Sequence, residues 1–453
     1  MENENASLDR LNRWIKNSVT LKLGTIGILI LILLIPSSMI KSIIDERESL
    51  SLSAISEVSS KWADEQTMTG PVLNVPLIYE YQNEVKDEKS NKLEIVTYEK
   101  TEILTILPNQ LKVNGSVSPK SLKRGIYEVV VYESELKVNG SFALDLEVDK
   151  TNLKEVRWNN AFITLGISDL RGIKEGVIFE CDEKRYSVKP GSKSDLIKSG
   201  VSFQPKIIDS LEKLNFEFIL SLQGSQNLSF IPLGGVTDVN LASKWTTPSF
   251  NGNFLPDKRS INENGFQATW KVLQLNRNYP QQWLGFQNPE QIKNSQFGVN
   301  LLLPLDDYQK SMRSAKYSVM TLALTFLVFF IVEILNKKKI HPLQYTLVGL
   351  GLCLFYILLV SISEHSNFNF SYLISSVSII TMITLYSLSI LRNKKMSMIL
   401  SVILVCIYGF VFITLQLADY ALLLGSIGLT IILGLTMYFT RKIDWYNIQE
   451  IGK

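Results

Sequence analysis

The sequence predicts a membrane protein built from one N-terminal transmembrane helix, a large extracytoplasmic β-rich domain and a C-terminal bundle of five transmembrane helices. Five apolar runs of about 20 residues lie in the C-terminal third, and a shorter one lies near the N-terminus. A helix of about 20 residues crosses the roughly 30 Å of bilayer hydrocarbon. The polar stretch between these regions contains alternating apolar and polar residues, which is typical of half-buried strands. We therefore expect an antiparallel, sandwich-like domain between membrane segments.

The expected segments follow directly from these runs. They are a cytoplasmic amphipathic segment at 1–22, a first transmembrane helix at 23–40, a periplasmic β-rich domain at 41–316, a transmembrane bundle at 317–440 with spans at 317–335, 343–362, 372–391, 397–416 and 420–440, and a cytoplasmic tail at 441–453.

The N-terminal segment has apolar residues at helical spacing with basic residues between them, which favours a helix lying on an anionic membrane surface. The apolar set is Leu8, Leu11, Trp14, Ile15 and Val19. A disordered tail with chance periodicity is the alternative. The apolar run that follows indicates a retained span, because the polar segment before it is long and no small-residue cleavage site follows it; a cleaved signal peptide is the alternative.

The domain expected at 41–316 begins with a helix. Apolar residues recur at helical spacing from Ile40 to Trp62, so the first transmembrane helix is expected to continue into the domain and to end before Gly70-Pro71. Two later stretches alternate clearly, around Phe216 and around Trp270, and predict strands with one buried face. Further strands are expected at 72–81, 94–107, 125–132, 157–167, 176–180 and 297–304.

A short internal echo lies within this domain. The string LKVNGSV at Leu111–Val117 resembles LKVNGSF at Leu136–Phe142. The Asn-Gly pairs in both copies indicate turns. Two similar strand-turn corners are favoured over a true duplication, since two copies do not make a repeat architecture.

The charge distribution sets the expected orientation. The segments that flank alternate span ends hold 13 Lys/Arg and 5 Asp/Glu, which leaves 33 basic and 38 acidic residues elsewhere in the 453-residue chain. Basic residues gather on the cytoplasmic side of membrane proteins. We therefore expect both termini in the cytoplasm and the β-rich domain outside, and no nucleic-acid partner, since the positive charge forms no stripe with interleaved aromatic residues.

Few residues suggest catalysis. The chain has two histidines, His341 and His365, which fall on opposite sides of the expected membrane, so a Ser-His-Asp site or a histidine zinc site within the domain is excluded. No phosphate-binding glycine motif occurs. A glycosidase that uses two carboxylates alone is not excluded. Cys181 is the single cysteine of the domain and is expected to be a small core residue. We expect no enzyme activity, no metal and no cofactor.

Two groups of residues are candidate sites. The segment Trp245–Pro256 is rich in aromatic residues, and it is expected either to present its side chains to a partner or to fold back on the core. Its candidate residues are Trp245, Pro248, Phe250, Phe254 and Pro256. The second group is a polar cluster at the outer membrane face, Glu364, His365 and Asp419, with ordinary solvated loop residues as the alternative.

Several bundle residues suit close helix packing. Gly349 and Cys353 in one span, and Gly425, Gly428 and Gly434 in the last, allow helices to approach closely. The span at 372–391 and the residue before it are rich in hydroxyls: Ser371, Ser375, Ser378, Thr381, Thr384 and Ser387. Hydrogen bonds between helices are favoured over a solute path.

Several long strings, in the same order along the chain, resemble the CreD family of bacterial inner-membrane proteins. They are GPVLNVPLIYEY, PLGGVTDVNLASKWTTPSFNGNFLPDKRSINENGFQATWKVLQLNR, FGVNLLLPLDDYQKSMRSAKYSVM, HPLQYTLVGLGLCLFYILLVSISEH and ADYALLLGSIGLTIILGLTMYFTRKIDWY. The resemblance spans about Leu21 to Tyr446. It implies a role in envelope integrity and colicin tolerance, and control by a carbon-source-responsive two-component system, with a link to the β-lactam response in some members. It attaches no firm enzymatic activity.

The expected function is therefore support of the cell envelope under stress, by binding or sensing an envelope component through the periplasmic domain. The expected partners are the lipid bilayer and an envelope protein or ligand that the sequence does not identify; the oligomeric state is equally open. A membrane transporter, or an accessory subunit of one, is the alternative, although the spans show no charged residue near their centres.

Overall fold

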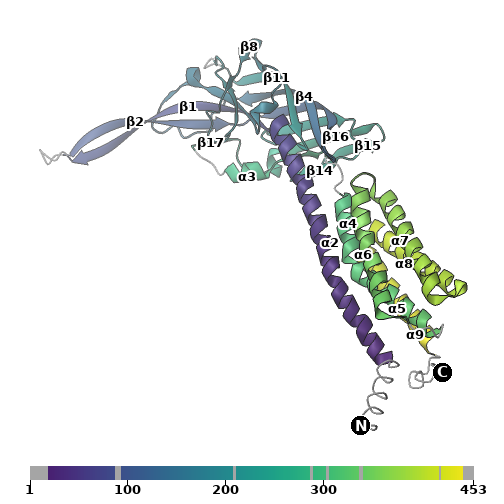
Figure 1. Ribbon diagram of the computed structural model, residues 1–453. Helices are drawn as coiled ribbons and strands as arrows, with labels where there is room; N and C mark the ends of the chain where they lie inside the picture. Colours follow the sequence, from purple (N-terminus) through teal and green to yellow (C-terminus); the bar gives the residue numbers. More distant parts are fainter. Residues whose placement is uncertain are drawn as a thin grey trace, which may run out of the picture. The chain divides into compact units, whose positions relative to one another are not determined.

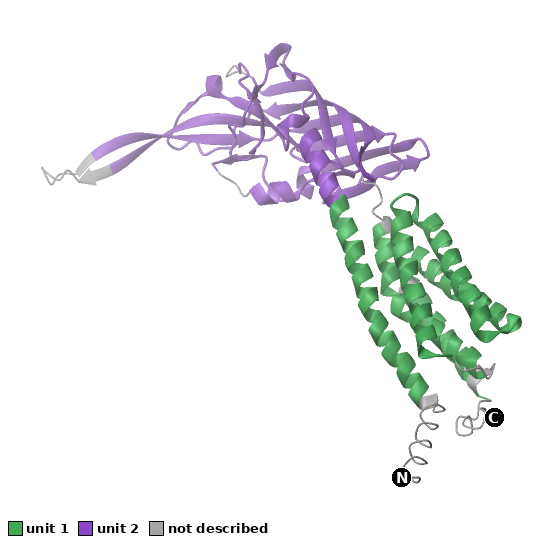
Figure 2. Ribbon diagram, viewed as in Figure 1, with its two compact units in different colours: residues 1–51, 304–453 green, residues 52–303 purple. Residues whose placement is uncertain are grey.

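The computed structural model describes residues 19–86, 93–207, 211–285, 289–301, 306–335, 340–417 and 420–441. The chain forms two compact units, which are shown in separate colours in Figure 2. Unit 1 comprises residues 1–51 and 304–453, and unit 2 comprises residues 52–303. Each unit is described by itself below.

The helix α2 (Val19–Trp62) is continuous over 44 residues, and it is the purple helix of Figure 1. Its first part is a run of Leu and Ile, which predicts the span, and its later part is amphipathic. The predicted continuation of the first transmembrane helix to Trp62 is confirmed. The helix ends at Trp62, before Gly70-Pro71 as expected, and those two residues lie inside the first strand.

Unit 2 contains two sheets that share one apolar core. Among the described residues, the first sheet has ten strands. Its main order is β14 (Ser249–Gly252), β18 (Phe297–Asn300), β12 (Asn227–Ile231), β1 (Gln66–Lys86), β6 (Phe162–Ile167), β10 (Gly200–Phe203) and β9 (Lys189–Pro190), with β2 (Leu93–Ile106) and β5 (Leu153–Val156) on β1 and β17 (Gln282–Leu284) on β2.

The second sheet has eight strands over the same described residues. Their order is β15 (Lys258–Asn262), β16 (Gly265–Leu273), β13 (Val236–Ser243), β3 (Gln110–Arg124), β4 (Tyr127–Ala143), β11 (Lys213–Ser225), β7 (Ile178–Cys181) and β8 (Lys184–Ser187). The short helices are η1 (Trp158–Asn160), η2 (Leu170–Gly172), η3 (Gln274–Asn276) and α3 (Pro289–Asn294).

The predicted alternation is confirmed in both of the clearest strands. In β11 every second residue from Leu214 to Leu222 is buried, and in β16 the buried set includes Phe266 and Trp270. The apolar faces of the two sheets therefore meet in the sandwich core. The sheets are not purely antiparallel, however, because β1 pairs with β12 in parallel and β13 pairs with β3 in parallel.

The echo predicted to form two turns is instead two paired strands. Its copies lie in β3 and β4 and pair antiparallel, with Val113 opposite Val138. The glycines are needed for packing: a Cβ on Gly115 would lie 2.6 Å from the side chain of Leu136, and one on Gly140 would lie within 2.5 Å of the Phe216 ring. The turn prediction was wrong because crowding against a core neighbour selects glycine as strongly as a turn does.

Unit 1 contains the apolar helices, of which α6, α7 and α8 lie side by side in Figure 1. Besides the first part of α2, its described helices are α4 (Asp306–Lys316), α5 (Ser318–Leu335), α6 (Pro342–Ser363), α7 (Phe368–Leu391), α8 (Lys394–Gln416) and α9 (Ala421–Thr440). Four described helices are long and apolar enough to cross a membrane, and the bent pair α4 and α5, with 45° between its parts, would make a fifth. The apolar stretch of α9 with described side chains, Leu423–Tyr438, is shorter than these helices.

Candidate functional site

The candidate site lies in unit 1, where a buried carboxylate meets three donors. Glu333 lies near the end of α5 and is 5% exposed. Its Oε1 is paired with the ammonium group of Lys22 on α2 and accepts a hydrogen bond of 2.8 Å from the backbone N–H of Ile340. Its Oε2 accepts a hydrogen bond of 2.8 Å from the hydroxyl of Tyr345 on α6. Ionisable side chains buried in a membrane bundle are expensive unless paired, and they commonly mark functional sites.

A second ion pair joins α2 to the bundle. Glu364, which ends α6, lies with Oε1 3.6 Å from Nε of Arg47, and its side chain is 10% exposed. Of the polar cluster predicted from sequence, Glu364 is thus placed against α2, His365 is exposed, and Asp419 lies outside the described residues. The arginine partner of Glu364 was missed by the sequence analysis.

The two cations share one face of α2. Lys22 and Arg47 are 25 residues apart, which is almost seven helical turns and about 37 Å along the axis. Buried residues on the same face lie between them: Ile26, Leu33, Ser37, Ile40 and Ile44. The hydroxyl of Ser37 lies 2.5 Å from that of Ser318, the first residue of α5. Since the hydrocarbon of a bilayer is about 30 Å thick, the two ion pairs fit its two borders. The 25-residue spacing of the two basic residues was the available sequence signal.

Three buried tyrosines meet inside the bundle. The rings of Tyr372 on α7 and Tyr408 on α8 lie 5.3 Å and 4.8 Å from the ring of Phe355 on α6, and the ring of Tyr356 lies 4.9 Å from it. The hydroxyl of Tyr372 donates to the carbonyl oxygen of Tyr408 over 2.8 Å. Among the described residues, the hydroxyl of Tyr408 has no hydrogen-bond partner, although it is fully buried.

The hydroxyls of α7 bond within their own helix rather than across helices. Ser371, Ser378 and Ser387 donate to carbonyl oxygens three or four residues earlier, over 2.8–2.9 Å. This back-bonding satisfies a hydroxyl inside one helix. Within the described part of the chain, the buried hydroxyls of Ser375 and Thr384 have no partner. The expected interhelical bonds are therefore not formed by these serines.

Close packing at two of the glycines is confirmed. A Cβ on Gly349 would lie 2.2 Å from the side chain of Leu33, so α6 and α2 touch at this point. A Cβ on Gly428 would lie 2.2 Å from the Phe410 ring. Around Gly425 and Gly434 a Cβ would meet nothing within 4 Å.

The aromatic segment predicted as a partner site lies against the core of unit 2. Phe250 on β14 makes edge contacts with Phe266 and Trp270, at 5.7 and 5.6 Å between ring centres, and Phe254 packs on Phe297. Trp245 is half-buried, with its indole N–H donating to the carbonyl of Thr247. Pro248 and Pro256 are also half-buried, whereas Leu255 is 65% exposed.

Unit 2 holds the end of α2 through several side chains. The guanidinium of Arg124 on β3 makes two hydrogen bonds to Glu57, at 3.0 and 3.2 Å. Arg171 on η2 donates to the carbonyl of Ser60, and Gln223 on β11 donates to the carbonyl of Trp62 over 2.9 Å. Arg171 and Gln223 thereby satisfy carbonyls that a helix end leaves unpaired, whereas Arg124 pairs with a side-chain carboxylate on the last turns of the helix. We call Arg124, Arg171 and Gln223 the helix clamp.

The two arginines of the helix clamp lower the pKa values of the carboxyl groups that they contact, Asp169 and Glu57. Hydrogen bonds from Arg171 lower the pKa of Asp169 to about 2, and hydrogen bonds from Lys61 and Arg124 lower the pKa of Glu57.

Burial raises the pKa of the Cys181 thiol to about 12. That cysteine is 2% exposed, so the prediction of a core residue is confirmed. In the part of the chain that the structure describes, no group of three or more His, Cys, Asp or Glu is arranged to hold a metal ion.

Comparison with known proteins gives consistent results. A family model described as "Inner membrane protein CreD" matches residues 18–446. The inner membrane protein CreD of Escherichia coli (strain K12) is 31% identical over 418 residues, which cover 92% of this chain and 91% of that protein. The match covers the chain from α2 to the last helix, including both units. The chain therefore belongs to the CreD family of inner membrane proteins.

Proposed function

We propose that this multi-pass inner-membrane protein supports the integrity of the cell envelope by binding an envelope component through unit 2. In this proposal unit 2 lies in the periplasm, both termini lie in the cytoplasm, and the role is not enzymatic. Loss of the protein would change resistance to envelope stress, and tolerance to colicins would be one measurable phenotype.

The observation that carries the binding role is the arm formed by β1 and β2, seen extending from its sheet in Figure 1. From residue 95 to residue 100 all side chains of β2 are exposed, including Ile95 at 67% and Val96 at 46%. Because neighbouring strand residues point to opposite faces, the arm exposes apolar side chains on both faces. A two-stranded ribbon is only marginally stable alone in water, and exposed apolar strand surface is typical of protein–protein contact.

The helix clamp supports a role in relaying binding to the membrane. One continuous helix, α2, is held by Arg124, Arg171 and Gln223 in unit 2 and by Glu333 and Glu364 in unit 1. A ligand can shift a protein between states only if it binds them with different affinity. We propose that the occupied and empty forms of unit 2 place the end of α2 differently, and that the two ion pairs in unit 1 respond.

Site-specific photo-crosslinking in cells tests the binding role. A crosslinking amino acid replaces Ile95 on the arm or Leu255 beside the predicted partner segment, and Ile219 of β11, which is 53% exposed, is the matched control. We expect a discrete crosslinked band from position 95 and none from position 219. Equal crosslinking at positions 95 and 219 would rule out the arm as the binding surface. A crosslinked band from position 255 alone would indicate that the aromatic segment is the binding surface.

The relay is tested separately. The double variant Arg124→Ala/Arg171→Ala removes two clamp groups, and Arg185→Ala removes a similar exposed pair with Glu180 that does not touch α2. We expect the double variant to reach normal levels and to keep the arm crosslink, but to fail to restore detergent resistance to a deletion strain. Full complementation by the double variant would reject the relay and leave the binding role intact.

Transport is the second candidate, and buried Glu333 favours it. The carboxylate lies among three donors, and buried hydroxyls including that of Tyr408 have no partner among the described residues. Proton-coupled transport would require Glu333, so Glu333→Gln should abolish acidification of proteoliposomes that hold a pH-sensitive dye. Alanine at Glu364, His365 or Asp419 should likewise change proton uptake while the amount of protein stays unchanged. Unaltered uptake in all of these variants would reject transport.

A further inference from the structure

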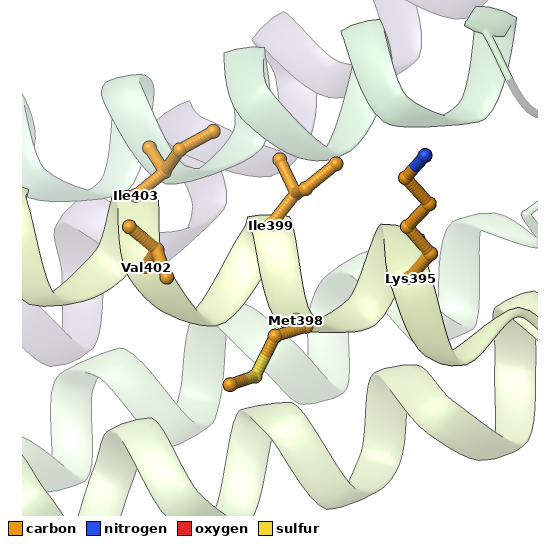
Figure 3. Close-up of a pocket in the computed structure, with 5 residues that line it drawn as sticks. All are labelled: Lys395, Met398, Ile399, Val402 and Ile403. Carbon is orange, nitrogen blue, oxygen red and sulfur yellow. The ribbon is translucent and has the colours of Figure 1, made fainter.

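A groove on α8 combines one cation with an apolar wall. It has a volume of about 360 Å³ and is lined by Lys395, Met398, Ile399, Val402 and Ile403. In Figure 3, Lys395, Ile399 and Ile403 follow one another along one side of the helix, and Met398 and Val402 lie beside them. Apart from the Lys395 ammonium group, every lining side chain is apolar or a thioether.

The mouth of the groove carries unneutralised positive charge. Arg392, Lys394 and Lys395 lie within four residues and are all exposed. Within the described ranges, none of the three forms an ion pair with a carboxylate. The contrast with α2 is direct, because both Lys22 and Arg47 are paired with bundle carboxylates. The cations at the start of α8 are therefore available to an anion from outside the chain.

The dimensions of the groove match one acyl chain in one leaflet. Lys395 and Ile403 are eight residues apart, or about 12 Å along the helix, which is close to half of the roughly 30 Å hydrocarbon thickness. The volume corresponds to about a dozen water-sized groups, and a methylene is of similar size. Because Met398 and Val402 are 66% and 55% exposed, a chain lying in the groove would cover apolar surface next to the charged mouth.

We propose that this groove holds one anionic phospholipid, with its phosphate group at Lys395 and one acyl chain along Ile399, Val402 and Ile403. A zwitterionic lipid would leave the positive charge of the mouth without a net counterion. A free phosphate ion would leave the apolar wall uncovered. An anionic diacyl lipid would place its phosphate group at the cationic mouth and cover the apolar wall with an acyl chain.

Native mass spectrometry of the full-length protein tests the proposal. The protein, purified in detergent, is titrated with phosphatidylglycerol or with phosphatidylethanolamine. We expect phosphatidylglycerol to be retained at least fivefold more strongly. Lys395→Gln should reduce that retention about fivefold, the factor that one basic residue near the membrane surface contributes. Lys394→Gln, which removes a neighbouring charge at the mouth but no group that lines the groove, should have a clearly smaller effect.

A second pair of variants tests the acyl chain. Val402→Trp fills the groove, and Val405→Trp places the same group at an equally exposed position of α8 that does not line it. We expect Val402→Trp to reduce the retention of phosphatidylglycerol and Val405→Trp to leave it unchanged. Met398→Trp is a second groove-filling variant, which should also reduce retention and replaces Val402→Trp if that variant lowers the yield of folded protein. The proposal would be overturned if Lys394→Gln and Lys395→Gln reduced the retention of phosphatidylglycerol equally. It would also be overturned if both groove-filling variants retained this lipid as well as the unmodified protein does. Competition by inorganic phosphate at the same concentration would also overturn it, since the site would then bind an anion without a lipid tail.

Discussion

Glu333 shows how a carboxylate side chain can be accommodated inside a membrane bundle. The carboxylate is paired with Lys22 and accepts hydrogen bonds from Ile340 and Tyr345, so both of its oxygens have donors. Removing one partner of such a pair is strongly unfavourable, because the other charge stays buried without compensation. Replacing both partners by apolar groups of similar volume is often neutral.

The first prediction follows from this asymmetry. Glu333→Gln should lower the free energy of unfolding by about 2 kcal/mol, because the neutral amide gives up the ion pair with Lys22 and the charge-assisted hydrogen bonds from Ile340 and Tyr345. The double variant Lys22→Met/Glu333→Gln should recover part of that loss, because it also removes the cation while the glutamine amide keeps an acceptor for the Tyr345 hydroxyl. Thermal unfolding of the purified protein, followed by light scattering and intrinsic fluorescence, measures both. A double variant less stable than Glu333→Gln would contradict the explanation.

Tyr408 and Tyr372 make a matched pair of buried hydroxyls. Tyr372→Phe removes the 2.8 Å hydrogen bond to the carbonyl of Tyr408 and should destabilise the protein by about 1 kcal/mol. Tyr408→Phe removes a hydroxyl that has no partner among the described residues and should be neutral or stabilising. The same melting assay compares them. If Tyr408→Phe proved the more harmful change, the hydroxyl would have a bound partner such as an ordered water.

Asp169 provides a pH-dependent contribution to the stability of unit 2. Its folded-state pKa of about 2 lies below its value of about 4 in an unfolded chain. The stabilisation is therefore fully present above about pH 4 and is lost as the pH falls through about 2, with a size of order 2 kcal/mol.

The prediction is that Asp169→Asn flattens the loss of stability between about pH 4 and pH 2. Tryptophan fluorescence suits the measurement, since Trp62, Trp158, Trp245, Trp270 and Trp283 all lie in unit 2. Asp182→Asn is a control on an exposed acid that is not paired with arginine among the described residues. An unchanged pH slope in Asp169→Asn would contradict the assignment.

At the scale of elements, α2 packs on the bundle through one face that is apolar in its middle and charged at its ends. Ile26, Leu33, Ile40 and Ile44 are buried, and the two basic residues extend the same face. The closest approach is at Gly349 of α6, where the side chain of Leu33 occupies the space that a Cβ would need. The face therefore fixes both the depth and the rotation of the helix against α6.

The corresponding prediction concerns this contact. Gly349→Ala should destabilise the protein by about 1–3 kcal/mol through overpacking against Leu33 and Phe326. Gly409→Ala, also within an α-helix but with nothing within 4 Å of the added carbon, should be neutral or stabilising by up to about 1 kcal/mol. Melting temperatures of the two variants give the comparison. Equal effects would show that α2 and α6 do not meet closely at Gly349.

At the scale of the whole molecule, the proposed orientation assigns unit 2 and the loop after α6 to the same side of the membrane. In a variant without Cys181, Cys353 and Cys406, we expect Lys244→Cys and Ser366→Cys to react with a membrane-impermeant thiol reagent added to intact spheroplasts. Lys394→Cys, at the start of α8, should react only after lysis. Labelling of positions 244 and 366 from different sides would overturn the orientation.

Much of the architecture was predictable because its signals are local. The apolar run in α8 and the alternation in β11 predict a helix and a strand, since burial follows the period of each element. The glycine of LKVNG was misread because its neighbour in space, Leu136, is far from it in sequence. The ion pairs of the candidate site were missed for the same reason: Glu333 and Glu364 have partners on α2, about 310 and 320 residues earlier in the sequence.

The amino-acid sequence by itself determined the partition of this chain into apolar helices and a β-rich unit, because hydropathy and period act over a few residues. It also determined the family, through long strings in a common order. Only the tertiary structure decided which charges neutralise one another, which strands pair in parallel and which buried hydroxyls have no partner among the described residues. These properties depend on contacts between residues distant in sequence. They arise only when packed elements exclude water, because a buried polar group can then form hydrogen bonds only with the protein groups next to it.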